Sequence, residues 1–287
     1  MCDEFIHQGL VEDKRITRRA FGMIAAATAT AAGAAIPVPG VTEKDVSMKT
    51  PDGTADAVLF APKKAGQFPA VLMWPDIMGL RPAFRDMGRR LAGEGYVVLV
   101  PNPFYRSKRA PVMEGPIDFG NPATREVLLG YRKAMSDQGI VKDAGAYLGF
   151  LDAQAKTSKH RKAGVQGYCM GGALAFMTAA AVPGRIGAVA SFHGGNGLVT
   201  KEPDSPHLLI PRTNAAFLVL QAQNDDAQQP QVKEELKRAF AEAHRRATVE
   251  VYPANHGWCV PGSQVYDHAQ AERAWSALLQ FYRVALA

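Results

Sequence analysis

The sequence predicts a doubly wound α/β fold, in which a mostly parallel sheet carries helices on both faces. The first observation is that short apolar runs alternate with longer amphipathic stretches over most of the 287 residues. The second is that these runs are apolar on both faces, which is typical of parallel strands buried on both sides. Right-handed crossovers between such strands make the doubly wound arrangement the simplest topology.

The short apolar runs are predicted to be strands because turn-forming residues or amphipathic stretches separate them. They span residues 56–62, 68–75, 96–103, 163–169, 186–195, 215–223 and 247–253. The amphipathic stretches have the spacing of helices with one apolar face. They span residues 82–93, 141–155, 170–181, 231–244 and 265–286.

Two long connections interrupt this alternation. Residues 102–140 are mixed in polarity and too long for an ordinary loop, so they form either a functional loop or a small helical insertion. Residues 194–214 form a second long loop after the carboxyl end of a strand. In an open parallel sheet, both segments would lie at the edge where ligands bind.

The N-terminal segment, residues 1–39, is predicted to be separate from a domain that spans residues 40–287. The pair Arg18-Arg19 precedes about fifteen weakly apolar residues and a small-residue stretch, Ala32-Gly33-Ala34. This order resembles a twin-arginine export signal followed by a spacer, and it predicts a periplasmic or secreted protein. The alternative is an ordinary Ala-rich helix on a cytoplasmic protein. The apolar run is too short for a stable membrane span.

Composition and charge exclude several classes of protein. A hydrophobic content of 47% excludes disorder for most of the chain. The net charge of +6 arises from dispersed basic residues without interleaved aromatic residues, so we expect no nucleic-acid partner. The three cysteines, Cys2, Cys169 and Cys259, show no C-x-x-C spacing, so we expect no metal site and no disulfide framework.

Cys169 lies in the sequence Gly-Tyr-Cys-Met-Gly, between a predicted strand and a predicted helix. This pattern is the thiol version of the nucleophile elbow, a sharp turn whose flanking positions have no room for side chains. The helix N-terminus favours a thiolate there, and the Met170 amide would face a developing oxyanion. The alternative is a small buried thiol, which most free cysteines are.

A cysteine nucleophile needs an imidazole and an acid that orients it. His256 follows the last predicted strand, and Asp225 and Asp226 follow the strand before it. The order Cys, Asp, His, with each residue just beyond a strand, is the order of α/β-hydrolases. We therefore predict Cys169, His256 and Asp225 as the catalytic residues. Asp226 is the fallback acid, although it could instead cap the next helix.

The loop after an early strand, Pro-Asp-Ile-Met-Gly-Leu, would supply the second oxyanion amide from Ile77. Asp76 is predicted to be a site residue because it lies at the same edge of the sheet. A carboxylate beside a thiolate is unfavourable unless one of them is shielded. The alternative for Asp76 is an N-cap of the helix that begins at Pro82.

These motifs resemble the dienelactone hydrolase family, a branch of the α/β-hydrolases with a cysteine nucleophile. The resemblance covers about residues 40–287 and depends on GYCMGGALAF, AQNDD, NHGWC, PDIMGL and VPNPFYR. It implies a triad of Cys169, His256 and Asp225. It also implies that Asp76 pairs with the resting thiol and that Arg106 binds a substrate carboxylate.

The sequence departs from this family at two positions. Asp76 stands where the best-known members carry Glu, and no Arg follows His256 to supply the second carboxylate contact. A charge-assisted contact of this kind contributes about 1.5–3 kcal/mol, so its loss weakens the case for a dienelactone as substrate. Trp258 and the aromatic residues of 102–140 favour a more apolar acyl pocket, although these side chains could instead pack in the core.

Taken together, the residues predict a cofactor-free hydrolase of small-molecule esters or lactones, acting as a monomer or small homo-oligomer. Two alternatives from other classes remain. One is a binding module without catalytic activity on a hydrolase scaffold. The other is an exported thiol-redox protein that uses Cys169 and Cys259.

Overall fold

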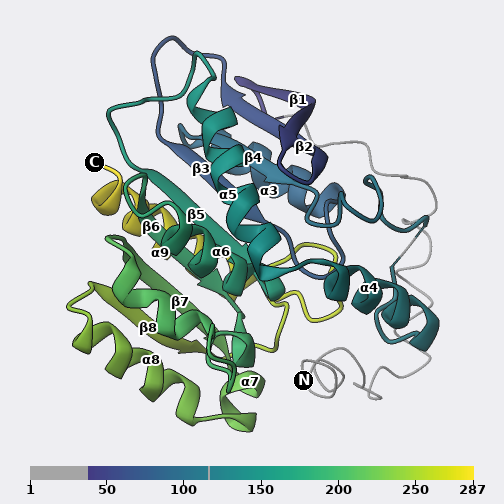
Figure 1. Ribbon diagram of the computed structural model, residues 1–287, viewed down its shortest axis with the longest axis vertical. Coiled ribbons are helices and arrows are strands. Elements are labelled where there is room, and N and C mark those ends of the chain that lie inside the picture. Colours follow the sequence, from purple (N-terminus) through teal and green to yellow (C-terminus); the bar gives the residue numbers. More distant parts are fainter. Residues whose placement is uncertain (1–37, 116) are drawn as a thin grey trace.

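The computed structural model describes residues 38–115 and 117–287, and its centre is an eight-stranded sheet (Figure 1). The strand order is β1-β2-β4-β3-β5-β6-β7-β8. All neighbours from β4 to β8 are parallel, whereas β1 and β2 pair antiparallel at one edge. The strands are β1 Val41–Thr50, β2 Gly53–Pro62, β3 Ala70–Trp74, β4 Val97–Pro101, β5 Ala163–Tyr168, β6 Ile186–Phe192, β7 Ala216–Ala222 and β8 Ala247–Tyr252.

The doubly wound prediction is confirmed, and each predicted strand is present. The prediction lacked β1, whose sequence VTEKDVSMKT has no apolar run because most of its side chains are exposed. An edge strand with one buried position does not need such a run, since its pairing with β2 is made by the backbone.

Helices cover both faces of the sheet. They are α3 Pro82–Gly93, α4 Pro122–Ala134, α5 Asp137–Asp152, α6 Met170–Ala181, α7 Gln223–Gln228, α8 Gln231–Glu242 and α9 His268–Ala285. Figure 1 shows α5 and α6 in front of the sheet and α9 behind it. The face with α5, α6 and α8 is one hydrophobic core, and the face with α3 and α9 is another.

The two cores explain why the strands are apolar on both faces. In β3, Leu72 packs into the first core and Val71 into the second, and neither is exposed. Burying such a side chain contributes about 1.5–3 kcal/mol relative to leaving it exposed. The sheet is therefore fixed from both sides, and its carboxyl edge becomes a rigid platform for loops.

The first long connection, 102–140, contains the helical insertion that the sequence allowed. Asn121 caps α4 by accepting hydrogen bonds from the amides of Ala123 and Thr124. Helix α5 begins at Asp137, four residues before its predicted start, because the Ser136 hydroxyl accepts a hydrogen bond from the Gly139 amide. The second connection, 194–214, contains two 3₁₀ helices, η1 Gly195–Gly197 and η2 Pro206–Arg212.

The predicted export signal and spacer, residues 1–39, lie almost wholly outside the described residues and stay a prediction. Within the described ranges, none of the helices combines the length and the apolar character that crossing a bilayer requires.

Candidate active site

Cys169 occupies a sharp turn between β5 and α6. Its backbone has φ 54° and ψ −121°, a strained conformation that non-glycine residues rarely adopt. The Cys169 amide donates to the Phe192 carbonyl at 3.0 Å, which anchors the turn to the end of β6. Cys169 as a whole residue is 8% exposed. Such strain persists only when the surroundings enforce it, and it is concentrated at functional positions.

The flanking glycines leave no room for side chains. A Cβ atom at Gly167 would lie 1.8 Å from the Gly171 carbonyl oxygen. One at Gly171 would lie 2.6 Å from the Trp74 carbonyl oxygen, at the end of β3. The first turn of α6 therefore packs directly against the loop that follows β3.

His256 and Asp225 are brought together from two different loops. The His256 Nδ1 atom lies 2.8 Å from the Asp225 Oδ2 atom. The His256 amide also donates to the Asn224 side chain at 2.8 Å, which holds the loop after β8 against α7. Gly195 approaches the carboxylate so closely that a Cβ atom there would lie 2.9 Å from Oδ2. These contacts fix the plane and the tautomer of the imidazole.

The charge of His256 is set by two neighbouring acids. Burial by itself would lower the pKa of the imidazole. The negative charges of Cys169 and Asp225, with hydrogen bonding to them, instead raise the His256 pKa well above its usual value of 6.5. The Nε2 atom is buried without a well-formed hydrogen bond among the described residues. The ring is therefore held by Asp225 at Nδ1, while Cys169 is near enough to the ring to raise its pKa.

The neighbouring Asp226 has a different partner. Its carboxylate pairs with Lys233 on α8 at 2.7 Å, and α8 begins without a side-chain cap. Of the two candidate acids, the structure brings only Asp225 to His256.

Ile77 and Met170 lie on the two segments that meet at the elbow. Ile77 follows β3, and Met170 is the first residue of α6. Among the described residues, neither amide has a backbone or side-chain acceptor in the loops around it. Unused amides on adjoining segments are what an oxyanion site needs.

Asp76 binds an arginine instead of the thiol that the family resemblance implied. Its two carboxylate oxygens accept hydrogen bonds from Arg81 at 2.6 and 2.8 Å, and one also accepts from the Met78 amide. It does not cap α3, which begins after Arg81 without a side-chain cap. In this structure Asp76 folds back on its own loop, so its charge is neutralised locally.

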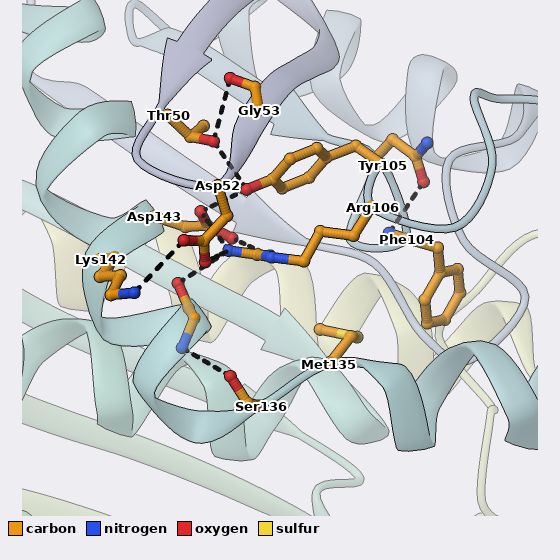
Figure 2. Close-up of polar contacts among 12 residues, drawn as sticks. Thr50, Asp52, Gly53, Phe104, Tyr105, Arg106, Met135, Ser136, Lys142 and Asp143 are labelled. Carbon is orange, nitrogen blue, oxygen red and sulfur yellow. Dashed lines mark hydrogen bonds and ion pairs between the residues drawn. The ribbon is translucent and has the colours of Figure 1, made fainter.

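Arg106, expected to bind a substrate carboxylate, is held by carboxylates of the protein itself (Figure 2). Its guanidinium pairs with Asp143 at 2.7 and 2.9 Å and with Asp52 at 2.8 Å. It also lies 4.5 Å from the Tyr105 ring, whose hydroxyl donates to Asp143. The structure thus ties Arg106 to α5 and to the β1–β2 turn.

Trp258, expected in the substrate pocket, is a core residue. Its side chain has no exposed area and stacks on Tyr252 with ring centres 5.3 Å apart. Its ring also lies edge-on to that of His193, with ring centres 5.2 Å apart, and a substrate cannot reach it in this conformation.

His193 is a residue to which the sequence analysis assigned no role. Its ring is almost fully buried and lies edge-on to His256, with ring centres 4.9 Å apart. Burial first, and then His256, lower the pKa of His193 well below its usual value, so it stays neutral. Among the described residues, neither of its ring nitrogens has a partner. His193 comes directly after the buried strand β6, and this position at the carboxyl end of a strand is the signal that could have identified it.

A cavity of about 750 Å³ is lined in part by segments that follow Ile77 and His256 along the chain. It is lined by residues between Met78 and Asp86, in the loop after β3 and the start of α3, by residues 111–115 and 117–120, and by Pro261 to Gln264. Met78 follows Ile77 directly, and Pro261 lies shortly after His256. Cys169, Asp225 and His256 are not themselves among its lining residues.

Neither a metal site nor a disulfide is found in the part of the chain that the structure describes. No three His, Cys, Asp or Glu side chains gather there as metal ligands would. The two described cysteines, Cys169 and Cys259, are both free.

Comparison with known proteins identifies the family and the fold of the chain. Residues 55–286 match the model of the dienelactone hydrolase family. An Escherichia coli K12 protein named "Putative carboxymethylenebutenolidase" is 28% identical over 77% of this chain and 79% of its own length. A crystal structure of a dienelactone hydrolase-like promiscuous phosphotriesterase from metagenomic libraries superposes with a TM-score of 0.69 at 21% identity, covering 86% of this chain and all of that one.

The dienelactone hydrolase from Anabaena variabilis superposes with a TM-score of 0.60 at 18% identity, covering 86% of this chain and all of that one. At these identities the solved structures show a shared fold, and the family model supplies the chemistry of the class. The chain belongs to the dienelactone hydrolase family and is an ester or lactone hydrolase of the α/β-hydrolase fold.

Proposed function

We propose that the protein hydrolyses carboxylic esters or lactones through an acyl-cysteine intermediate, with Cys169 as nucleophile, His256 as general base and acid, and Asp225 as the orienting acid. The observation that carries this proposal is the half-satisfied imidazole. Asp225 holds His256 at Nδ1, Nε2 has no well-formed hydrogen bond among the described residues, and Cys169 at the strained elbow is near enough to raise the pKa of the ring. A ring nitrogen left without a partner next to a thiol is available for proton transfer.

In the first half of the reaction, His256 takes the proton of the Cys169 thiol, and the thiolate sulfur attacks the carbonyl carbon. The carbonyl oxygen becomes an oxyanion, which the amides of Ile77 and Met170 stabilise. When the intermediate collapses, the bond between the carbonyl carbon and the alkoxy oxygen breaks. The leaving oxygen receives the proton from His256, and an acyl thioester remains on Cys169.

In the second half, His256 takes a proton from water as the water oxygen attacks the thioester carbon. The carbon–sulfur bond then breaks, the carboxylic acid is released, and the proton returns to the sulfur. The raised pKa of His256 strengthens it as a proton acceptor. No step needs a cofactor.

The decisive test compares the two free thiols of the described chain. Cys169→Ala should lower kcat/KM for p-nitrophenyl esters by about 10⁴-fold or more, since it removes the nucleophile itself. The matched control, Cys259→Ala, removes the other buried thiol and should change kcat/KM less than tenfold. Full activity of Cys169→Ala would refute the mechanism.

Thiol labelling separates the two alternatives from the enzyme. An activated Cys169 should react with iodoacetamide faster than a free cysteine, with the modified residue located by mass spectrometry. In a non-catalytic binding module, Cys169 would react at the ordinary rate and no ester would turn over. In a thiol-redox protein, a bridge between Cys169 and Cys259 would form under oxidising conditions.

We also propose that residues 1–39 direct export by a twin-arginine pathway. Fusion of this segment to a reporter should place the reporter outside the cytoplasm, and replacing Arg18 and Arg19 by Lys should prevent this. A monomer or small homo-oligomer is our expectation for the assembly, and light scattering would measure it.

A further inference from the structure

The cavity beside Ile77 has an apolar interior. Its lining includes Met78, Leu80, Val112, Met113, Ile117 and Phe119. Leu80, Val112 and Phe119 are themselves buried in the walls, so the apolar surface is built into the fold. A volume of about 750 Å³ is within the range of small-molecule sites. The cavity can therefore hold an apolar group, and its lining residue Met78 directly follows Ile77, whose amide is proposed to bind the oxyanion.

The charges of this cavity are mainly negative. Three carboxylates, those of Asp86, Glu114 and Asp118, line it, together with one guanidinium, that of Arg81. Asp86 pairs with Arg89. Among the described residues, neither Glu114 nor Asp118 has a cationic partner within ion-pair distance. An anion entering the cavity would therefore meet two carboxylates without a neutralising partner.

The guanidinium is not available to bind an anion. Both terminal nitrogens of Arg81 donate hydrogen bonds to the two carboxylate oxygens of Asp76. The Nη1 atom also donates to the Gly79 carbonyl. Its flat face lies 4.9 Å from the Phe84 ring. The bidentate pair neutralises the charge and fixes the side chain, so binding a substrate carboxylate would require breaking it.

Arg106 is occupied in the same way by Asp143 and Asp52. The sequence also places no arginine shortly after His256. On the proposed hydrolytic function, we infer that this cavity selects uncharged apolar esters or lactones and rejects substrates that carry a carboxylate. The specificity of this chain would thus differ from that of an enzyme whose substrate is held by arginines.

The test uses two esters with the same six-carbon acyl chain and the same leaving group. One is p-nitrophenyl hexanoate, and the other is mono-p-nitrophenyl adipate, which ends in a carboxylate where hexanoate ends in a methyl group. After correction for the hydroxide-catalysed rates, kcat/KM should favour hexanoate by about 30-fold or more in low salt. The preference should shrink as the salt concentration rises, because exposed charges are then screened.

A matched pair of variants separates a local from a general charge effect. Glu114→Gln with Asp118→Asn should reduce the preference for hexanoate at least threefold. Glu126→Gln removes a negative charge from the exposed surface of α4, outside the cavity lining, and should leave the preference unchanged.

The outcomes distinguish the inference from the function on which it rests. Turnover of the adipate ester at least as fast as the hexanoate ester would overturn the specificity and leave the hydrolase intact. Failure to turn over either ester, together with an unreactive Cys169, would overturn the proposed function itself.

Discussion

Asp225 on α7 and Asp143 on α5 are both buried carboxylates, and each holds a basic side chain. Asp143 receives two hydrogen bonds from Arg106 and one from Tyr105, and Arg106 is further bound by Asp52. Asp225 instead holds one nitrogen of His256 and leaves the other without a well-formed partner. The charged groups of the Asp143 cluster are paired with one another, whereas in the Asp225 cluster the Nε2 atom of His256 has no well-formed hydrogen bond.

This difference indicates what each cluster does. A network whose members are satisfied within the protein stabilises the fold and has no capacity left for a ligand. A buried nitrogen without a partner costs free energy, and when it lies near a nucleophile it is available to take up a proton. The comparison thus predicts that the Asp225 cluster governs activity and that the Asp143 cluster governs stability.

The largest effect that separates the clusters is expected from Asp225→Asn. The amide keeps the shape but favours the wrong imidazole tautomer, so kcat should fall about 10³- to 10⁴-fold. Steady-state kinetics with p-nitrophenyl hexanoate would measure this. Asp226→Asn is the control, since Asp226 pairs with Lys233, and its kcat should stay within a few-fold of wild type. Equal losses in both variants would contradict the assignment of Asp225.

Asp143→Ala is expected to lower the stability of the fold and to leave kcat almost unchanged. Removing this carboxylate leaves the guanidinium of Arg106 partly buried and short of its main partner, which should lower the free energy of unfolding by about 3 kcal/mol. Urea denaturation would measure the loss. The kcat of the folded fraction should change little. A variant of normal stability with a large loss of kcat would place Asp143 in the chemistry and break the comparison.

A smaller effect concerns how stability depends on pH. The pKa of folded His256 is raised above the unfolded value near 6.5, so its ion pairs stabilise the fold fully below that pH and cease to do so as pH rises through the folded pKa. The difference in free energy of unfolding between wild type and His256→Gln should therefore be largest in mild acid and shrink on the alkaline side. Urea titrations across this pH range would measure the difference in free energy of unfolding. A difference that grows with pH would contradict the prediction.

The smallest effect is expected from His193→Phe, which tests whether an unpartnered nitrogen is enough to mark a functional residue. The aromatic ring preserves the edge-on packing against His256 and Trp258 while removing two unpartnered nitrogens. We expect kcat/KM to change less than about tenfold and stability by less than about 1.5 kcal/mol. A loss of activity above 100-fold at normal stability would make His193 a second positioning residue for His256.

Much of the fold could be predicted from local sequence. The apolar runs identified the strands buried on both faces because burial there imposes a composition, as at Val71 and Leu72. The exposed strand β1 was not predicted, because pairing through the backbone does not require an apolar composition. The elbow at Cys169 was visible for a similar reason, since the glycines around it are required by backbone contacts.

The sequence by itself determined the order of the elements, the elbow and the short list of residues that could reach it. Only the tertiary structure decided their partners. It joined His256 to Asp225 and Asp226 to Lys233, tied Asp76 to Arg81 and Arg106 to Asp143, and buried Trp258 in the core. The physical reason is the separation along the chain between the residues that interact. Strands and tight turns are governed by burial and backbone sterics within a few residues, which leave a local pattern. Ion pairs join side chains from distant loops, and the angle at which each loop leaves the sheet decides which charges meet.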